Sequence, residues 1–242
     1  MPTGKPARTP GRKKAKPSAV QTPAAPPSRG ERRKRETREK LLGAAFRLMA
    51  ERGADAVTIN EITEAADVGF GSFYNHFASR EEIYGALIDS IFEDFADMLD
   101  RLAADIGDPA EVIAVSIRHT LRRARREPLW GRFLVREGLS PQLYSHGLGA
   151  RLFRDIERGI AEERFPLRDP AMSFFAVGGG VLAAIAAELA DDEAGLLKGH
   201  GRERKDLPER AAVALLQVLG IPARQAEAIA RRPLPVADRQ EI

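Results

Sequence analysis

The sequence predicts an all-α protein, and three observations indicate that fold class. From position 31 onward, apolar residues recur at intervals of three and four, and no segment shows the sustained alternation that marks a half-buried strand. The chain has 242 residues, of which 43% are hydrophobic, so it can bury a sizeable core. Ser, Thr or Asp stands before several of the periodic segments, where a side chain caps a helix. We therefore expect a body of packed helices.

Residues 1–30 differ from the rest of the chain in charge and composition. They contain seven Lys or Arg and no acid, whereas the rest of the chain carries 31 basic against 35 acidic residues. They also hold seven of the 16 prolines, so they offer too little apolar surface to offset the entropy of ordering. We expect a disordered tail, which is either an arm that contacts nucleic-acid phosphates or a solvated leader with no binding role.

Three helices are expected before residue 79. The first covers residues 32–52 and stops at Gly53. Thr58 starts the second, residues 58–65, in a capping box with Glu61. The third covers residues 69–75, and residues 66–68 form the turn between the second and the third.

Further helices are expected after residue 79, and each has a local start signal. Ser79 with Glu82 opens a long helix that ends before Gly107. The later helices cover residues 110–126, 128–136, 141–163 (Ser140 as cap, Pro141 in the first turn), 170–189 (from Asp169-Pro170), 206–219 (Asp206 with Glu209) and a short stretch from Pro222. The predicted domains are a tail (1–30), an N-terminal unit of three helices (31–79), a larger helical unit (80–231) and a frayed end (232–242).

The two short helices have the spacing of a helix-turn-helix, which by itself is weak evidence of DNA binding. The composition of the second one strengthens it, because Gly71 permits a close backbone approach to base edges. Hydrogen-bonding groups come from Ser72, Tyr74, Asn75 and His76, whereas Phe73 and Phe77 can anchor the helix. The alternative is a small structural core, since Phe70, Phe73, Tyr74 and Phe77 fit one helical stripe, although two glycines would weaken such a helix.

Residues 35–84 resemble the N-terminal DNA-binding domain of the tetracycline-repressor (TetR) family without a gap. The matching elements are Ala44-Ala45, Glu51-Arg52-Gly53, Thr58, Ile62, Ala65-Ala66, the run Gly71-Ser72-Phe73-Tyr74-Asn75-His76-Phe77, and Ser79-Arg80-Glu81-Glu82. The resemblance implies that Phe70, Gly71 and Ser72 face the major groove and that Phe73 and Phe77 lie in the core. It also implies phosphate contacts by Arg38, Thr58, Tyr74, His76 and Arg80, with Asn75 on the same DNA-facing helix.

Three positions depart from the family pattern. Asp67 stands where Gly is frequent, so we expect Asp67 to adopt a left-handed backbone. Gly69 replaces the usual Ser or Thr cap of the third helix, and Phe70 replaces a residue that is often polar or basic. Phe70 therefore either packs on a thymine methyl group or folds back onto the core.

The resemblance beyond residue 85 is architectural only, and it implies a dimer interface and an effector pocket. The expected interface is a four-helix contact between two copies, built from Val177, Gly180, Ala184, Ala187, Val213 and Leu216. Packing within one chain is the alternative. The candidate pocket residues are Phe92, Phe95, Trp130, Phe133, Phe153 and Phe174, whose low charge favours a hydrophobic effector.

The resulting hypothesis is a cytoplasmic homodimeric transcriptional repressor that binds a near-palindromic operator of double-stranded DNA and is released by a small hydrophobic effector. No cofactor or metal is expected, because His119 and His146 stand outside any metal-ligand spacing and the chain has no Cys. No membrane span is expected, because the apolar run 177–189 has 13 residues. The alternatives are an all-helical enzyme with a structural N-terminal bundle and an architectural DNA-binding protein without an effector.

Overall fold

The computed structural model describes residues 28–140, 147–190 and 206–236, and its regular elements in those ranges are all helical. The predicted all-α fold class is therefore confirmed. Most of the tail 1–30, the frayed end after residue 236 and the proposed start at Pro141 lie outside the described residues. Within them, α1 (Arg29–Arg52) begins three residues earlier than expected because Ser28 and Glu31 form a capping box.

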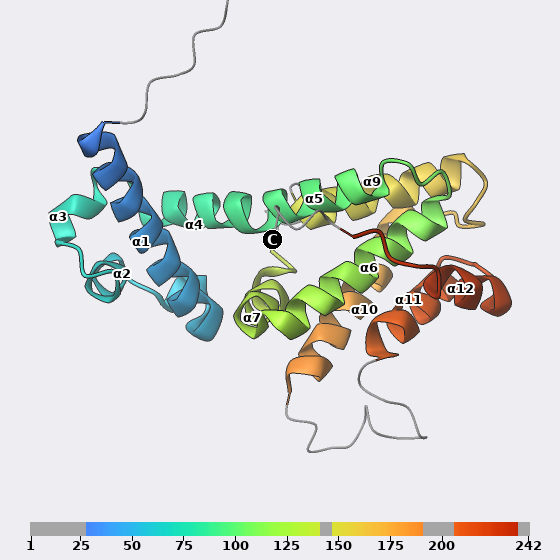
Figure 1. Ribbon diagram of the computed structural model, residues 1–242. Helices are drawn as coiled ribbons and strands as arrows, with labels where there is room; N and C mark the ends of the chain where they lie inside the picture. The colour runs from blue at the N-terminus through green and yellow to red at the C-terminus, as the bar shows by residue number, and fades with distance from the viewer. Residues whose placement is uncertain (1–27, 141–146, 191–205, 237–242) are drawn as a thin grey trace, which may run out of the picture.

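The N-terminal helices form a group at one end of the molecule (Figure 1). After α1, a 3-10 turn (Ala54–Ala56) leads to α2 (Ile59–Ala65) and α3 (Phe70–Phe73). From this group, α4 (Arg80–Ile88) runs towards the larger helical body, where it joins α5 (Asp94–Ala103) through a π-helical turn, Asp89–Glu93. The predicted continuous helix is therefore interrupted at that turn.

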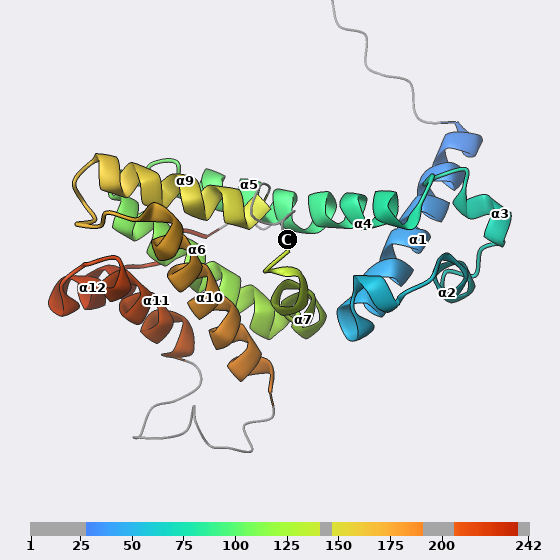
Figure 2. The same cartoon turned by 180° about the vertical axis from the view of Figure 1, so that it is seen from behind.

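The larger body consists of helices that pack around a common core. Its elements are α5, α6 (Pro109–Arg126), α7 (Pro128–Glu137), α9 (Gly147–Ala161), α10 (Pro170–Leu189), α11 (Leu207–Val218) and α12 (Ala223–Ala230). Figure 2 shows α10 and α11 next to each other on the side opposite to that of Figure 1. Asp108 and Asp169 cap α6 and α10 as local sequence signals indicate.

The predicted capping box at the start of α11 is not formed. Asp206 makes no side-chain cap hydrogen bond, and Glu209 instead accepts hydrogen bonds from Arg118 and Arg122 of α6. Arg118 is buried, so a carboxylate that neutralises it outweighs a local backbone contact.

Helix α7 connects the N-terminal group to the larger body. The Phe46 ring of α1 meets Phe133 of α7 edge to face, with centroids 5.4 Å apart. Arg136 of α7 donates to the Glu51 carbonyl at 3.0 Å, and the Tyr84 hydroxyl of α4 donates to Glu137 at 2.8 Å. The two parts of the protein are thus joined by aromatic packing and by hydrogen bonds.

Helix α10 is long and apolar enough, by length and composition, to cross a membrane. It has 20 residues with a mean hydropathy of 1.8 in its most apolar window, and 22% of that window is buried in this chain. The sequence-based expectation counted residues 177–189 and omitted the uncharged turns before them, so it did not anticipate an apolar helix of this length. Helix α10 carries one charged residue, Glu188, and most of its apolar window is not buried in this chain, so it leaves an apolar surface that calls for an explanation.

Candidate nucleic-acid interface and internal cavity

The start of α2 is held by the capping box that the sequence predicts. The Thr58 hydroxyl accepts a hydrogen bond from the Glu61 amide at 3.3 Å, and the Glu61 carboxylate accepts one from the Thr58 amide at 2.8 Å. Arg52 donates to Glu61 at 2.7 Å, and this hydrogen bond, together with those from Thr58, lowers the pKa of Glu61 to about 2. The entry of α2 is thereby linked to the last turn of α1.

The turn between α2 and α3 has the backbone that its sequence indicates. Asp67 has a φ of 53°, so the expected left-handed conformation is confirmed. The Val68 amide closes the turn by donating to the Thr63 carbonyl at 3.0 Å. Gly69 provides no side-chain cap for α3, as its lack of a side chain requires.

Two buried phenylalanines anchor α3. Phe73 and Phe77 are 0% and 1% exposed, and their ring centroids lie 5.7 Å apart. The α-helical part is shorter than the predicted 69–75, because the Asn75 and His76 amides donate to carbonyls only three residues back. The core role that the family resemblance implies for Phe73 and Phe77 agrees with this burial.

The remaining side chains of this segment divide into an exposed and a half-buried set. Phe70 and Tyr74 are 51% and 52% exposed, and their rings meet edge to face at 5.7 Å. Phe70 therefore leans on Tyr74 and does not fold back onto the core. Gly71 and Asn75 are also exposed, whereas Ser72 and His76 are half-buried. The stripe that favoured a structural core thus has two inward and two outward members.

The basic first half of α1 lies beside this segment. Burial lowers the pKa of His76, and the charges of Lys34 and Arg38 lower it further, so His76 can donate or accept a hydrogen bond as a neutral ring. The guanidinium carbon of Arg38 lies 4.7 Å from the centroid of the Phe77 ring. Positive charge from α1 therefore lies next to His76 and Phe77, which follow α3.

Two predicted phosphate ligands already have partners within the chain. Arg80 donates to the Ala54 carbonyl at 2.9 Å and pairs with Asp55 at 3.4 Å, so it fastens α4 to the 3-10 turn after α1. Thr58 is exposed but engaged in its capping box. A phosphate contact by either residue stays a prediction, and it would have to add to these bonds or exchange with them.

A cavity of about 110 Å³ lies among α5, α6, α9 and α10. Most of its lining is apolar, with Leu99, Ile113, Ile117, Leu152 and Phe174 among the lining residues. The polar groups in the lining come from Asp100, Ser116, Thr120, Arg151 and Asp155. The arrangement is an apolar pocket with one polar corner, which is typical of a small-ligand site.

Most of the aromatic residues predicted for the pocket lie elsewhere. Of the six, Phe174 lines the cavity, and Phe153 packs against Phe174 at 5.8 Å. Phe92 stacks on Phe133 at 5.6 Å, and Trp130 contacts both Phe92 and Phe95. These last four residues form a packed cluster next to α7 because large rings bury more surface against one another than around an open space.

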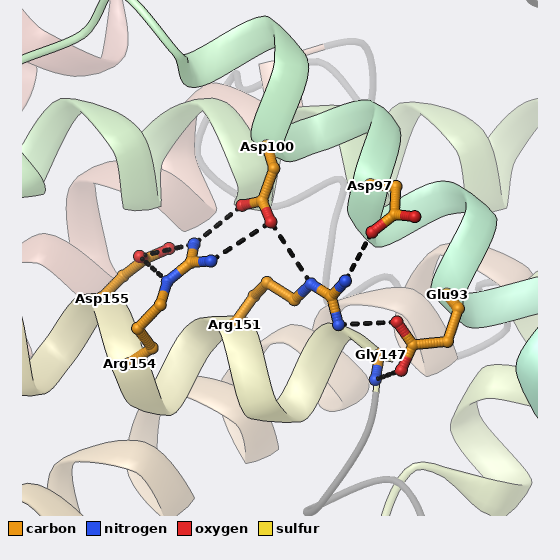
Figure 3. Close-up of polar contacts among 7 residues, drawn as sticks. All are labelled: Glu93, Asp97, Asp100, Gly147, Arg151, Arg154 and Asp155. Atoms are coloured by element: carbon orange, nitrogen blue, oxygen red, sulfur yellow. Dashed lines mark hydrogen bonds and ion pairs between the residues drawn. The ribbon is translucent and has the colours of Figure 1, made fainter.

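The charged residues of the polar corner belong to a network of ion pairs between α5 and α9 (Figure 3). Arg151 contacts Glu93 at 2.6 Å, Asp97, and Asp100 at 3.4 Å. Arg154 pairs with Asp100 at 2.7 Å and with Asp155 at 2.8 Å. Burial raises the pKa of Asp155, whereas for Asp100 the two arginines outweigh burial and its pKa is lowered.

This network of ion pairs was not predicted, although the spacing of the charged residues indicates it. Glu93, Asp97 and Asp100 follow at intervals of four and three, so they share one helix face. Arg151 and Arg154 have the same spacing on α9. Complementary charges at matching intervals on two amphipathic helices indicate that these helices lie side by side.

The predicted dimer residues lie mostly on an inward face. Val177 and Leu216 are fully buried within the chain, and a Cβ at Gly180 would lie 2.5 Å from Leu215 of α11. Ala184, Ala187 and Val213 are half-buried. The small residues on this face let α10 approach α11 of its own chain. Packing within one chain accounts for Val177, Gly180 and Leu216, whereas a dimer contact by the half-buried Ala184, Ala187 and Val213 stays a prediction.

A different face of the same two helices is exposed and apolar. Met172 and Phe175 of α10 are 61% and 49% exposed, and Val218 of α11 is 46% exposed. Ala176, Ala183, Ala186 and Ala214 are exposed as well. We call these seven residues the apolar face of α10 and α11.

The histidines and acidic residues outside these sites show no metal-binding arrangement. The Nε2 atom of His119 lies 3.1 Å from the Pro235 carbonyl oxygen, and burial lowers the pKa of His119. His146 lies outside the described residues. In the part of the chain that the structure describes, no group of three His, Cys, Asp or Glu side chains could hold a metal ion.

Comparison with known families gives two matches that together cover most of the described chain. Residues 41–87 match the family described as "Bacterial regulatory proteins, tetR family". Residues 108–232 match the family described as "Tetracyclin repressor-like, C-terminal domain". The second match alone spans more than half of the 242 residues.

Individual proteins agree with these matches. The transcriptional regulator TcmR of Streptomyces glaucescens is 34% identical over 116 residues, which is 48% of this chain and 50% of TcmR. The transcriptional repressor KstR2 of Mycobacterium tuberculosis is 39% identical over 71 residues, or 29% of this chain and 34% of KstR2. The chain thus spans between a third and half of the length of these two relatives.

One solved structure is similar over almost its full length. RolR in complex with resorcinol has 36% sequence identity and a TM-score of 0.61, and the match covers 85% of this chain and 98% of the RolR chain. Because the match covers this much of both chains, it includes the N-terminal helices as well as the helices around the cavity.

Proposed function

Because this chain belongs to the tetracycline-repressor family of DNA-binding transcriptional regulators, we propose that it is a repressor that leaves its operator when a small molecule occupies the cavity. The observation that carries the DNA-binding part is the exposed surface of α3. Phe70 and Tyr74 point outward from a segment that Phe73 and Phe77 hold in the core. Membership of a family of transcription factors also disfavours the alternative that this chain is an all-helical enzyme.

We place α3 in the major groove of the operator. Phe70, Gly71 and Ser72 face the base edges, and Phe70 contacts a thymine methyl group, because half of its ring is accessible. A Cβ at Gly71 would meet no atom of the chain within 4 Å, so this side of α3 is open to a close approach. Arg38, Thr58, Tyr74, Asn75, His76 and Arg80 surround it as hydrogen-bonding or phosphate-binding groups.

The operator-binding form is a homodimer. The apolar face of α10 and α11 provides a surface that water covers poorly, and two copies of this face can bury each other around a two-fold axis. A dimer then presents two copies of α3 to successive major grooves about 34–36 Å apart, which requires a near-palindromic operator. Membership of a transcription-factor family supports burial of α10 against a second copy rather than in lipid.

The effector is a small single-ring compound with a polar substituent. A cavity of about 110 Å³ is well below the ~300–1,000 Å³ of typical drug-sized ligand sites and is closer to, though smaller than, the ~150 Å³ apolar cavity that binds benzene. This size favours a phenol over a larger hydrophobic effector such as an acyl chain or a sterol. The RolR structure contains resorcinol, a ring with two hydroxyl groups. The polar corner of the cavity offers carboxylate and hydroxyl partners for such groups.

The test is a footprint on the DNA upstream of the coding region for this chain, followed by titration with resorcinol as the first effector probe. A sequence-selective footprint with two-fold symmetry is expected, with an affinity that falls steeply as salt rises. Tyr74→Phe and Arg80→Ala should each weaken binding, and Arg80→Ala, which removes a positive charge, should also reduce the salt slope; Arg158→Ala on α9, remote from α3, serves as the control. Wild-type affinity in both variants would refute the phosphate assignments.

Deletion of residues 1–30 separates the repressor from the architectural alternative. Loss of non-specific affinity alone agrees with a repressor that reads DNA through α3. Loss of all DNA binding would mean that the basic tail, and not α3, supplies the interface.

A further inference from the structure

The π-helical turn between α4 and α5 has a structural cause that can be read from the buried residues on its two sides. Ile83, Leu87 and Ile88 are the buried residues of α4, and Phe95, Ala96 and Leu99 are those of α5. At about 100° per residue, a continuous α-helix would place the centres of these two buried faces roughly 110° apart. A π-turn accommodates about one extra residue and thereby removes a rotation of about 100°. The turn therefore aligns both faces with the core.

The π-turn is fastened on its outer side by Glu93. One carboxylate oxygen of Glu93 accepts a hydrogen bond from the backbone amide of Gly147, and the other contacts Arg151 at 2.6 Å (Figure 3). Both donors belong to the first turns of α9. Glu93 thus joins the turn to α9, and the side chain of Arg151 also lines the cavity.

The π-turn is fastened on its inner side by Phe92. The Phe92 ring lies parallel to Phe133 of α7, with an interplanar angle of 4°, and Phe133 in turn contacts Phe46 of α1. A change in the conformation of the π-turn would therefore move the Phe92 ring. This ring packs against α7, the helix that contacts α1 of the N-terminal group. The π-turn therefore contacts the ion-pair network beside the cavity on one side. On its other side it contacts the aromatic rings that pack between the N-terminal helices and the larger body.

We propose that the π-turn Asp89–Glu93 is the element through which the cavity controls the DNA-binding helices, with Arg151 and Glu93 as the positioning residues that connect them. This inference rests on the proposed function. A ligand with a hydroxyl group in the polar corner competes for Arg151 and Asp100 and so weakens the contact of Arg151 with Glu93. The turn then loses its outer fastening, and α4 changes its register relative to α5. Because α4 leads directly to the helix-turn-helix, the two α3 helices of a dimer leave their matched spacing.

The experiment measures operator affinity of the full chain without any effector, by fluorescence anisotropy on the footprinted DNA. Glu93 is not among the residues that line the cavity, so Glu93→Gln removes the negative charge and one of the two acceptor oxygens of the fastening while leaving the cavity wall intact. We expect its operator Kd to rise at least tenfold and amide hydrogen exchange in residues 85–96 to accelerate. Arg151→Gln should have the same effect, and the double variant should be no weaker than either single variant.

Glu162→Gln is the matched control, because Glu162 pairs with Arg158 on the same helix but away from the turn. It should keep the wild-type operator affinity and exchange rates. Folding of each variant is checked by circular dichroism, and if Glu93→Gln does not fold, Arg151→Gln carries the test. A folded variant of the pair that binds the operator with the wild-type constant would overturn the inference. Failure of the unmodified chain to bind any operator would instead overturn the proposed function.

Discussion

Replacement of Phe70 by Ala should weaken operator binding without unfolding the protein. The structure gives the expected cost in stability. Complete burial of a Phe side chain stabilises a protein by about 1.5–3 kcal/mol, and Phe70 is 51% exposed, so about half of that is at stake. Ala is also the better helix former, which offsets part of the loss. We expect the free energy of unfolding to fall by about 1 kcal/mol or less.

The cost in operator affinity should be larger, because two copies of α3 act in one complex. Losing a favourable contact to one base pair costs about 1 kcal/mol at the low end of the usual range. Two such losses amount to about 2 kcal/mol, which corresponds to a roughly 30-fold rise in the operator Kd. Phe73→Ala is the matched variant, since Phe73 is fully buried in the same segment and its loss should cost about 3–5 kcal/mol of stability.

The assays are urea unfolding followed by circular dichroism and operator titration by fluorescence anisotropy at constant salt. The assignment of Phe70 to the DNA surface would be refuted by a Phe70→Ala variant that binds the operator as tightly as the wild type. A loss of stability as large as that of Phe73→Ala would also refute it, since that would mean that Phe70 is a core residue.

Three further predictions concern the α2 cap, the dimer and the cavity. The pKa of Glu61 is about 2 in the folded chain against an ordinary value of 4.5, so its stabilising effect is present above about pH 4.5 and is lost as the pH falls towards 2; Glu61→Gln should therefore show a smaller drop in melting temperature between pH 6 and pH 3 than the wild type, and equal drops would contradict the assignment. Ala183→Glu places a charge on the exposed apolar face of α10 and should give monomers in sedimentation velocity, whereas Ala161→Glu at the exposed end of α9 should stay dimeric; a dimeric Ala183→Glu would rule out this face as the interface. Val181→Phe inserts a ring into the cavity and should abolish resorcinol binding in calorimetry while operator affinity stays within threefold of the wild type; undiminished resorcinol binding would place the effector site elsewhere.

Several features follow from residues close together in the sequence, and these were predictable. The Thr58–Glu61 capping box, the Asp108 and Asp169 caps and the left-handed Asp67 each depend on contacts within one turn of chain. Residue type and spacing suffice to predict such contacts where no tertiary partner competes for the same side chain, as Arg118 does for Glu209 at the start of α11. The helical periodicity predicted the fold class for the same reason.

Other features depend on which surfaces meet across the fold. The small residues of α10 predicted a close helix contact, but whether α11 of the same chain or a second copy occupies it depends on the path of the chain. The aromatic residues predicted burial, but the structure decides that Phe92, Trp130 and Phe133 fill the space beside α7 instead of lining a cavity. The sequence pattern indicates that a residue is buried but not which residue it packs against, because many pairings of helices satisfy the same pattern of apolar residues.

The sequence by itself determined the helices, most of their caps, and the family to which the helix-turn-helix belongs. Only the tertiary structure decided that Phe70 is exposed, that a cavity with a polar corner lies between α5 and α9, and that a π-turn aligns α4 with α5. The physical reason is the separation along the chain of the residues that interact. Capping and periodicity act over three or four residues, whereas Arg151 meets Glu93 across 58 positions of chain, and that contact exists only once the helices have packed.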